Sequence, residues 1–286
     1  MELKEKLVSS FIAFENQISL DNTFVHDMRT EAIKRFESQG FPAKKDEAWK
    51  YTSLGKVLKQ DFSVFPKTEF AVEYKDVQSY FIHDIDSYKI VFVDGKYASH
   101  LSETTHDGID ICLMSAALSK PKYSLVIENY FNKIAEKNGL TSLNTAFTNE
   151  GAYIHITKNK LVEKPIQIIH FSTGSEAALL LQPRNLIVVD ENAHVQIIER
   201  HQSLTDNPTL TNCVTEIFAD KRGIVDYYKV QNDKENASLI DSTFIDQKRE
   251  SHVSVHTFSF GGKLTRNNLN FYQNGAYIDS TLNGVT

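Results

Sequence analysis

The sequence predicts a mainly β protein in which an N-terminal helical and mixed α/β region, residues 1–139, precedes a β solenoid, residues 140–286. Three observations support this division. Apolar residues recur at helical spacing only in the first part of the chain. After Leu140, short β-branched runs alternate with Gly, Asn, Asp and Lys, and small residues return at intervals of 25 to 41 positions. Such a repeat is typical of a parallel β-helix, whose turns stack on one another.

The first forty residues contain two amphipathic helical patterns. In each of them the apolar residues are spaced by three and four, which places them on one helix face. The first set is Leu3, Leu7, Phe11, Phe14 and Ile18, and the second is Phe24, Met28, Ala32, Ile33 and Phe36. Gly40, followed closely by Pro42, predicts the end of the second helix.

The next hundred residues mix helix and strand signals. In KKDEAWKYTSL, residues 44–54, Asp46 is a candidate helix N-cap. The stretch Lys89–Leu101 alternates around Asp94-Gly95, which predicts a two-residue hairpin turn. A further helix is predicted over Ser124–Asn138, with the glycine that follows as its stop.

The stretch GAYI occurs twice, within residues 149–156 and within residues 273–280. Three further segments align with these two by a small first residue and alternating apolar residues. In this register the five small residues are Ala152, Ala193, Gly223, Ser251 and Ala276. A small side chain suits a tight corner, and the Ile and Val residues at alternate positions after it are expected to point into the bore.

An antiparallel β-sandwich is the alternative architecture, because it also places short strands at regular intervals. The spacing alone does not separate the two folds. The recurring corner favours the β-helix, since a sandwich has no reason to repeat the same corner.

Composition narrows the classes of partner. The net charge of −6 and the isoelectric point near 5.9 argue against nucleic acid, which prefers a basic surface. No apolar run approaches the roughly 20 residues that span a bilayer, and the first residues lack the features of a signal peptide. With only two cysteines, a disulfide framework is not expected, and we expect a cytoplasmic protein.

Five segments, in order along nearly the whole chain, resemble blocks of the SufB/SufD family of iron–sulfur cluster assembly proteins, and the SufD branch most closely. The segments are DEAWKYTSL (46–54), LNTAFTNEGAYIHI (143–156), VEKPI (162–166), NLIVVDENAHVQIIE (185–199) and FSFGGKLTRNNLN (258–270). Each block is short, but their shared order makes a chance resemblance improbable.

The resemblance implies an N-terminal helical region followed by a right-handed parallel β-helix, and a non-catalytic subunit of a cytoplasmic SufBCD scaffold complex. It implies a SufB-like paralogue as partner, and a SufC-like ATPase that docks on a C-terminal domain. Because family members are longer, we expect this chain to be a fragment without the last turns and that domain. The family's Cys and His at the heterodimer junction would lie in those turns. An iron–sulfur cluster would be assembled transiently by the complex, so no cofactor, catalytic or metal-binding residue is assigned here.

Six histidines of the repeat region were weighed as metal ligands: His155, His170, His194, His201, His252 and His256. A metal site requires several ligands that converge on one point. His252 and His256 share a strand face but would stand roughly 13 Å apart. Stacking could bring His155 near His194 or His252, yet we expect all six to be surface or wall residues.

Cys112 and Cys213 have no basic neighbour in sequence that would favour a thiolate, so both are expected to be small buried hydrophobic residues. Arg266 follows a Gly-Gly turn that could bind an anion, although a structural corner is favoured. Trp49 and Tyr51 are candidates for partner binding, because tryptophan is enriched in binding hot spots. The alternative is that Trp49 anchors the N-terminal helices.

Two other classes of function compete with a non-catalytic assembly subunit. The first is a β-helix enzyme that acts on carbohydrates through carboxylates on one outer face. Asp226, Asp241, Asp246 and Asp279 are available for it, but they form no recurring pair in register. The second is a structural solenoid that associates with itself, and a homodimer is compatible with that class.

Overall fold

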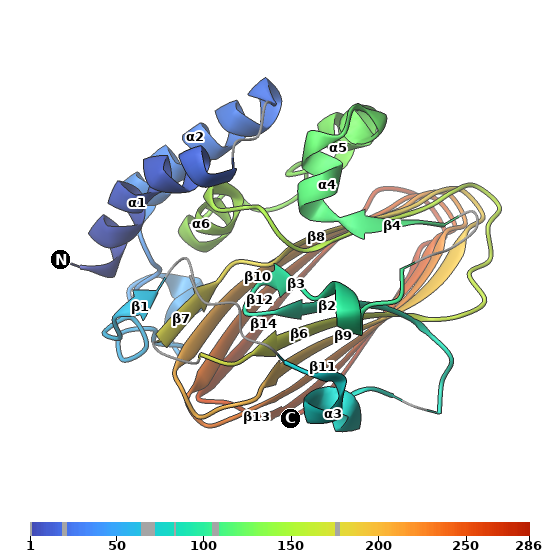
Figure 1. The fold of residues 1–286 in the computed structure, drawn as a ribbon. Helices are drawn as coiled ribbons and strands as arrows, with labels where there is room; N and C mark the ends of the chain where they lie inside the picture. The colour runs from blue at the N-terminus through green and yellow to red at the C-terminus, as the bar shows by residue number, and fades with distance from the viewer. Residues whose placement is uncertain (1, 19–21, 64–71, 83, 105–108, 175–177) are drawn as a thin grey trace.

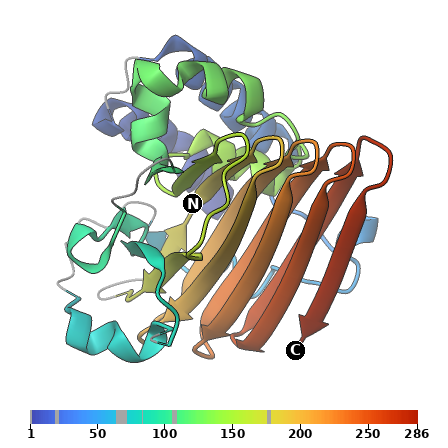
Figure 2. The same ribbon diagram turned by 90° about the vertical axis from the view of Figure 1, so that its right-hand side faces the viewer.

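The computed structural model describes residues 2–18, 22–63, 72–82, 84–104, 109–174 and 178–286. Two β-sheets face each other across a narrow bore, and the chain passes from one sheet to the other in successive turns (Figures 1 and 2). The long strands pair in parallel with the strand one turn later. The predicted parallel β-helix is therefore confirmed, and the sandwich is not formed.

Within the described residues, sheet A contains eight strands and sheet B contains seven. The strands of sheet A are β1 (Phe62–Ser63), β4 (Ile109–Leu113), β5 (Ala152–Ile156), β7 (Ala178–Leu181), β8 (Arg184–Val189), β10 (Thr209–Ala219), β12 (Ala237–Gln247) and β14 (Leu264–Gln273). Those of sheet B are β2 (Tyr88–Val93), β3 (Lys96–Tyr97), β6 (Ile166–Ser172), β9 (His194–Ser203), β11 (Ile224–Asp233), β13 (His252–Gly261) and β15 (Asp279–Val285). The pairs β2–β3 and β4–β5 are antiparallel.

The corners of the solenoid repeat one backbone conformation. Where the chain passes from sheet A to sheet B, a residue with positive φ occurs at each corner: Asn159, Asn192, Arg222, Glu250 and Tyr277. At three corners the next residue is small, and its amide donates back across the turn, as Gly223 does to the Asp220 carbonyl at 2.8 Å. Gly223 is tightly confined, because a Cβ there would lie 2.9 Å from that same carbonyl oxygen.

The expected register is correct for three of the five aligned segments and wrong for both GAYI copies. Ile224 pairs with His194 and with His252, as the alignment of Ala193, Gly223 and Ser251 requires. The first GAYI copy instead lies in sheet A, where Tyr153 pairs with Leu186.

The second GAYI copy is itself the corner that precedes β15, and Asp279 rather than Tyr277 pairs with His252. The error is a shift of two residues. Such a shift keeps every side chain on the same face of the strand, so strand alternation does not reveal it.

Helices cover the outer faces of both sheets (Figure 1). They are α1 (Leu3–Ile18), α2 (Thr23–Gln39), α4 (Met114–Ser119), α5 (Ser124–Tyr130) and α6 (Gly139–Ala146) over sheet A, and α3 (Tyr74–Val77) over sheet B. Short 3₁₀ turns lie at η1 (Glu47–Trp49), η2 (Gln78–Tyr80), η3 (Ser99–Leu101) and η4 (Pro121–Tyr123). The two predicted N-terminal helices are confirmed, and Gly40 ends the second with φ of 68°.

The Asp94-Gly95 hairpin is also confirmed, with positive φ at both residues as a type I′ turn requires. Asp46 precedes η1, but its carboxylate accepts from the Ala43 amide and does not cap that turn.

The predicted helix over Ser124–Asn138 is too long. It ends at Tyr130, and Gly139 begins α6 instead of stopping a helix. The cause is Glu216 on β10, a fully buried carboxylate whose side chain points outward from sheet A toward this segment. Its carboxylate accepts hydrogen bonds of 2.7 to 3.1 Å from the backbone amides of Asn132, Ile134 and Ala135. These amides would otherwise continue the hydrogen bonding of the helix. Arg184 donates to the same carboxylate at 2.6 Å.

Gly151, the glycine of the first GAYI copy, allows a very close approach between two backbone segments. Its φ is 147°, and a Cβ there would lie 1.9 Å from the carbonyl oxygen of Arg184. We expect Gly151→Ala to lower the free energy of unfolding by about 2–4 kcal/mol, through strain and overpacking. Denaturant unfolding measures this, with Gly55→Ala as the control, since a Cβ at Gly55 meets only the Ser53 hydroxyl at 3.6 Å. Equal stability of the two variants would contradict the close approach.

Candidate functional site

The bore of the solenoid is apolar along one half of its length and polar along the other. Side chains point inward at every second position of a strand, so residues in register form columns across the turns. On β9, β10 and β11 the apolar part of the bore contains Val195, Ile197, Ile217, Ala219, Val225 and Tyr227. Further along the same strands the inward positions are polar: Glu199, His201, Cys213, Thr215, Lys229 and Gln231, all buried.

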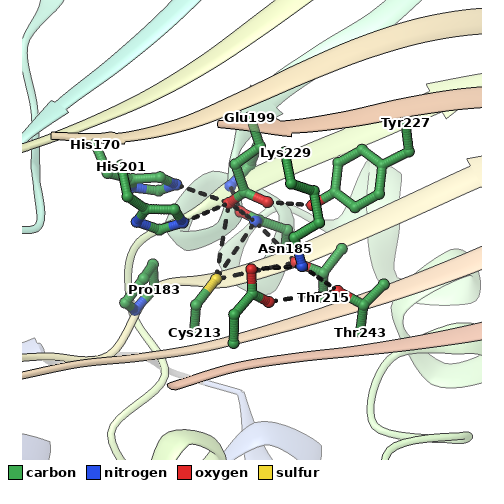
Figure 3. A network of polar contacts seen from close by, with 12 residues as sticks. His170, Pro183, Asn185, Glu199, His201, Cys213, Thr215, Tyr227, Lys229 and Thr243 are labelled. Atoms are coloured by element: carbon green, nitrogen blue, oxygen red, sulfur yellow. Dashed lines mark hydrogen bonds and ion pairs between the residues drawn. The ribbon is translucent and has the colours of Figure 1, made fainter. Parts of the chain in front are cut away.

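Glu199 is the centre of the polar half (Figure 3). It is fully buried, and its Oε1 atom lies 3.1 Å from Nε2 of His170 and 2.9 Å from the donating Nδ2 of Asn185. Its other oxygen accepts a hydrogen bond from the Tyr227 hydroxyl, and the Cys213 thiol donates to Oε1 at 3.7 Å. Both sheets thus supply donors to one carboxylate.

His170 and His201 occupy the same column, because β6 and β9 pair them directly in register. Their rings stack with centroids 4.7 Å apart and planes 11° apart. Nε2 of His201 lies 3.5 Å from Oε1 of Glu199, an ion-pair distance, yet it has no hydrogen-bond partner among the described residues. The three potential ligand atoms all lie within 4.8 Å of one another.

The electrostatics of the cluster favour an ionised carboxylate. Burial acts to raise the pKa of Glu199, but the hydrogen bond from His170 and the charge of the nearby His201 outweigh it and hold the pKa well below its usual range. Burial opposes a charge on His201, yet Glu199 raises its pKa. Burial prevails at His170 and lowers its pKa. Burial also raises the pKa of the Cys213 thiol.

A second charged pair lies beside this cluster. The Lys229 ammonium contacts the Asp241 carboxylate and donates to the Thr243 hydroxyl at 2.7 Å. Both charged residues are buried, with Lys229 6% and Asp241 1% exposed, so water screens neither charge. Because Lys229 is matched by Asp241, Glu199 does not depend on it for charge balance.

Two cavities lie against the histidines of the cluster. The larger has a volume of about 480 Å³ and is lined by residues of α1, the β2–β3 hairpin and the segment 180–183 before β8, together with His170. The smaller has a volume of about 20 Å³ and lies against both His170 and His201. That volume accommodates one water-sized species. Chemically, the site offers two imidazoles, a carboxylate and a thiol at the end of an apolar-lined approach.

The structure separates the six histidines into two groups. His170 and His201 line the bore, whereas His155 and His194 pair on the outer faces with Asp190 and Asp226, at 3.1 and 3.2 Å. His252 is exposed, and His256 stacks on Tyr228. Stacking does not bring His155 next to His194 or His252, since His155 lies in the other sheet.

The clustering of His170 with His201 was missed because β6 was not among the aligned segments. Glu199 and His201 follow Val195 and Ile197 at every second position of β9. This alternation in the sequence could have predicted that both side chains point into the bore.

The cysteines differ from expectation in their surroundings. Cys213 is fully buried as predicted, but it faces the polar cluster rather than an apolar core. Cys112 is only partly buried, packs under the α4–α5 layer, and has its pKa raised to about 11 by that burial.

Trp49 and Tyr51 are placed differently from each other. Trp49 is half-buried, with the Arg266 guanidinium 4.1 Å from its ring, and Arg266 also donates to the Thr52 hydroxyl at 2.9 Å. Arg266 therefore bridges β14 to the N-terminal region. Tyr51 is 92% exposed, and partner binding by these two aromatic residues stays a prediction.

The four carboxylates of the enzyme alternative do not gather. Asp241 lies in the bore and Asp226 on the outer face of sheet B with Ser254, whereas Asp246 pairs with Lys248 at 2.8 Å. Asp279 is exposed at the start of β15. No two of these four form the facing pair that glycoside hydrolysis uses.

Sequence comparison places the fold in a family. Residues 1–168 match the SufBD protein N-terminal region, and residues 170–286 match the SufBD core domain of the SUF system for FeS cluster assembly. The chain therefore belongs to the SufBD family, which confirms the resemblance. The two matched regions meet near residue 169, whereas the division expected from the sequence pattern was at 139. Strand β2 of the first region pairs with β6, so both regions contribute to sheet B.

Three relatives show the range of similarity. The chain is 26% identical to an iron–sulfur cluster assembly SufBD family protein of Synechocystis, over 88% of this chain and 57% of the relative. It is 28% identical to the iron–sulfur cluster assembly protein SufD of Bacillus subtilis, over 56% of this chain and 38% of that relative. It is 23% identical to the iron–sulfur cluster assembly protein SufD of Escherichia coli, over 86% of this chain and 55% of that relative. The chain thus spans little more than half the length of these relatives at most. Among the described helices, none has the length and apolar character needed to span a membrane.

The buried Lys229–Asp241 pair gives a direct test of how the bore is stabilised. Lys229→Met leaves Asp241 as an uncompensated buried charge, so we expect a loss of about 3–5 kcal/mol of unfolding free energy. The double variant Lys229→Met/Asp241→Leu should recover most of it, since both charges are then removed. Lys158→Met, at an exposed pair with Glu191, is the control and should change stability by no more than about 1 kcal/mol. Denaturant unfolding of all three variants measures the difference, and a tolerated Lys229→Met would contradict the pairing.

Glu150, which lines the larger cavity, makes stability depend on pH. Burial raises its pKa to about 7, and one of its oxygens has no partner among the described residues. An acid with a raised folded-state pKa favours folding while it is protonated, so stability falls as pH rises from about 4.5 through 7. Glu150→Gln should remove this loss. We expect the variant to gain about 1–2 kcal/mol on the wild type between pH 5 and pH 8, a discounted value because the side chain is partly exposed.

Unfolding midpoints measured across that pH range test the prediction. The exposed Glu163 supplies the control variant, Glu163→Gln, which should leave the pH profile unchanged. Parallel profiles for the wild type and Glu150→Gln would show that Glu150 is not the titrating group.

Proposed function

We propose that this chain acts as a SufD-type subunit in iron–sulfur cluster assembly, paired with a SufB-like paralogue and working with a SufC-like ATPase. The observation that carries the proposal is the match of both halves of the chain to the SufBD regions, in order, on a continuous parallel β-helix. Relatives from Bacillus subtilis and Escherichia coli are named as SufD assembly proteins.

A non-catalytic role within such an assembly is supported by the state of the reactive groups. Both cysteines have raised pKa values because of burial, so neither thiol is poised as a nucleophile at neutral pH. The carboxylates that a carbohydrate-active β-helix would need lie in separate environments. A self-associating solenoid is the remaining alternative, and the relatives' names favour assembly with other Suf proteins over it.

Co-purification tests the proposal. The tagged chain would be co-expressed with the SufB-like and SufC-like proteins of its own organism, and the eluate analysed by mass spectrometry and size-exclusion chromatography. We expect the SufB-like protein to elute with the tagged chain in a defined ratio. An unrelated parallel β-helix protein carrying the same tag is the control for adhesion between solenoids.

Two outcomes would overturn the assignment. If the chain co-purifies with neither Suf protein, the assembly role fails. If the chain elutes only as a homo-oligomer in their presence, the self-associating solenoid replaces it.

A further inference from the structure

We propose that His170, Glu199 and His201 bind one first-row transition-metal dication in the bore, with Cys213 as a fourth donor. This inference does not depend on the proposed assembly function, because all four ligands belong to this chain and to its described core.

The first support is the geometry of the donor atoms. Metal–ligand bonds of about 2.0–2.2 Å at tetrahedral angles place neighbouring N and O ligand atoms roughly 3.4 Å apart. The two Nε2–Oε1 distances, 3.1 Å for His170 and 3.5 Å for His201, bracket that separation. A metal–sulfur bond of about 2.3 Å places sulfur roughly 3.6 Å from the same oxygen, close to the 3.7 Å of Cys213. The sulfur is not among the atoms that lie within 4.8 Å of one another, so Cys213 joins the set by turning its side chain toward the histidines. Because the two rings stack across neighbouring strands, tipping them together closes the gap between their nitrogens.

The second support is a buried imidazole nitrogen that has no hydrogen-bond partner. His201 is only 5% exposed, and its Nε2 has no hydrogen-bond partner among the described residues. A buried polar atom without a partner is costly, so it calls for an explanation. A metal ion held between this nitrogen and the Glu199 carboxylate, 3.5 Å away, would supply the missing partner.

The third support is the way in which the carboxylate is held. The Tyr227 hydroxyl and the Asn185 amide both donate to Glu199, which fixes the carboxylate between the histidines. Groups that orient a ligand in this manner typically surround metal sites. A purely internal ion pair between His201 and Glu199 is the competing explanation, and it leaves the buried Nε2 of His201 without a hydrogen bond.

The donor set indicates the class of cation. Two imidazoles with a carboxylate and a thiol suit Zn²⁺, Co²⁺ or Fe²⁺, whereas Mg²⁺ and Ca²⁺ prefer oxygen ligands. The larger cavity leads to His170 from the exterior and supplies a route for the ion.

Cobalt is the probe of choice, because its absorption reports the ligands. The wild-type chain, dialysed against a chelator and kept free of oxygen, would be titrated with Co²⁺. We expect saturation at one equivalent, visible d–d bands, a near-ultraviolet sulfur-to-cobalt band, and loss of all of them on adding Zn²⁺. Absence of saturable binding by the wild type would overturn the site, whatever the variants do.

Matched variants assign the ligands. His201→Gln should weaken Co²⁺ binding by roughly 100-fold, and Cys213→Ser should remove the near-ultraviolet band while the d–d bands remain. His155→Gln, at an outer-face ion pair of similar distance, should bind as the wild type does. Equal weakening in His155→Gln and His201→Gln would overturn the assignment, and a near-ultraviolet band that survives in Cys213→Ser would exclude the thiol.

Circular dichroism establishes whether each variant is folded. If His201→Gln does not fold, X-ray absorption of the Zn²⁺-loaded wild type replaces it. Two imidazoles and one sulfur in the first coordination sphere support the site, and a shell of oxygen atoms alone overturns it.

Discussion

The rest of the structure depends on in-register parallel pairing between successive turns. When β9, β11 and β13 pair residue for residue, each inward side chain lies directly over an inward side chain of the next turn. The spacing between neighbouring strands is about 4.8 Å, too small for water to separate the members of a column. A polar residue in the bore must therefore find its partner in its own column, in a neighbouring column or on the opposite sheet. The polar half of the bore satisfies this condition with charges and hydrogen bonds that cross between sheets A and B.

The same pairing sets the role of the outer layer. Strand β10 carries Cys213 and Thr215 inward and Glu216 outward, so its two faces hold two separate charged networks. The outward network fixes the segment after α5 by capturing its amides, and Arg184 neutralises the carboxylate at its centre. Helices of the N-terminal region are thus attached to the solenoid by buried charge as well as by apolar packing. An uncompensated charge in either network would be expensive, and this explains why each anion is found with a cation or several donors.

Much of the fold follows from the sequence, because strand alternation and helical spacing are local signals. The N-terminal helices, the Asp94-Gly95 turn and the corners at Ala193, Gly223 and Ser251 all lie where those patterns predict. The end of α5 does not, because it is decided by Glu216, more than eighty residues away in the chain. The register of the second GAYI copy was missed since a shift of two residues preserves the alternation on which the alignment was based, and the first copy was misplaced because alternation does not tell one sheet from the other. The polar cluster escaped notice for a related reason: His170 and His201 meet only through strand pairing, and each looks isolated in sequence.

The candidate site also depends on both family regions. The larger cavity has one wall from the core, at His170 and the segment 180–183, and another from the N-terminal region, at the β2–β3 hairpin. That hairpin is held in place because β2 pairs with β6, and because Asp94 accepts the Thr173 amide at 2.6 Å. A core without the N-terminal region would keep Glu199 and the two histidines but would lose the wall that confines the approach to them. Access to the polar half of the bore is therefore a property of the joined chain, although the donors themselves belong to the core.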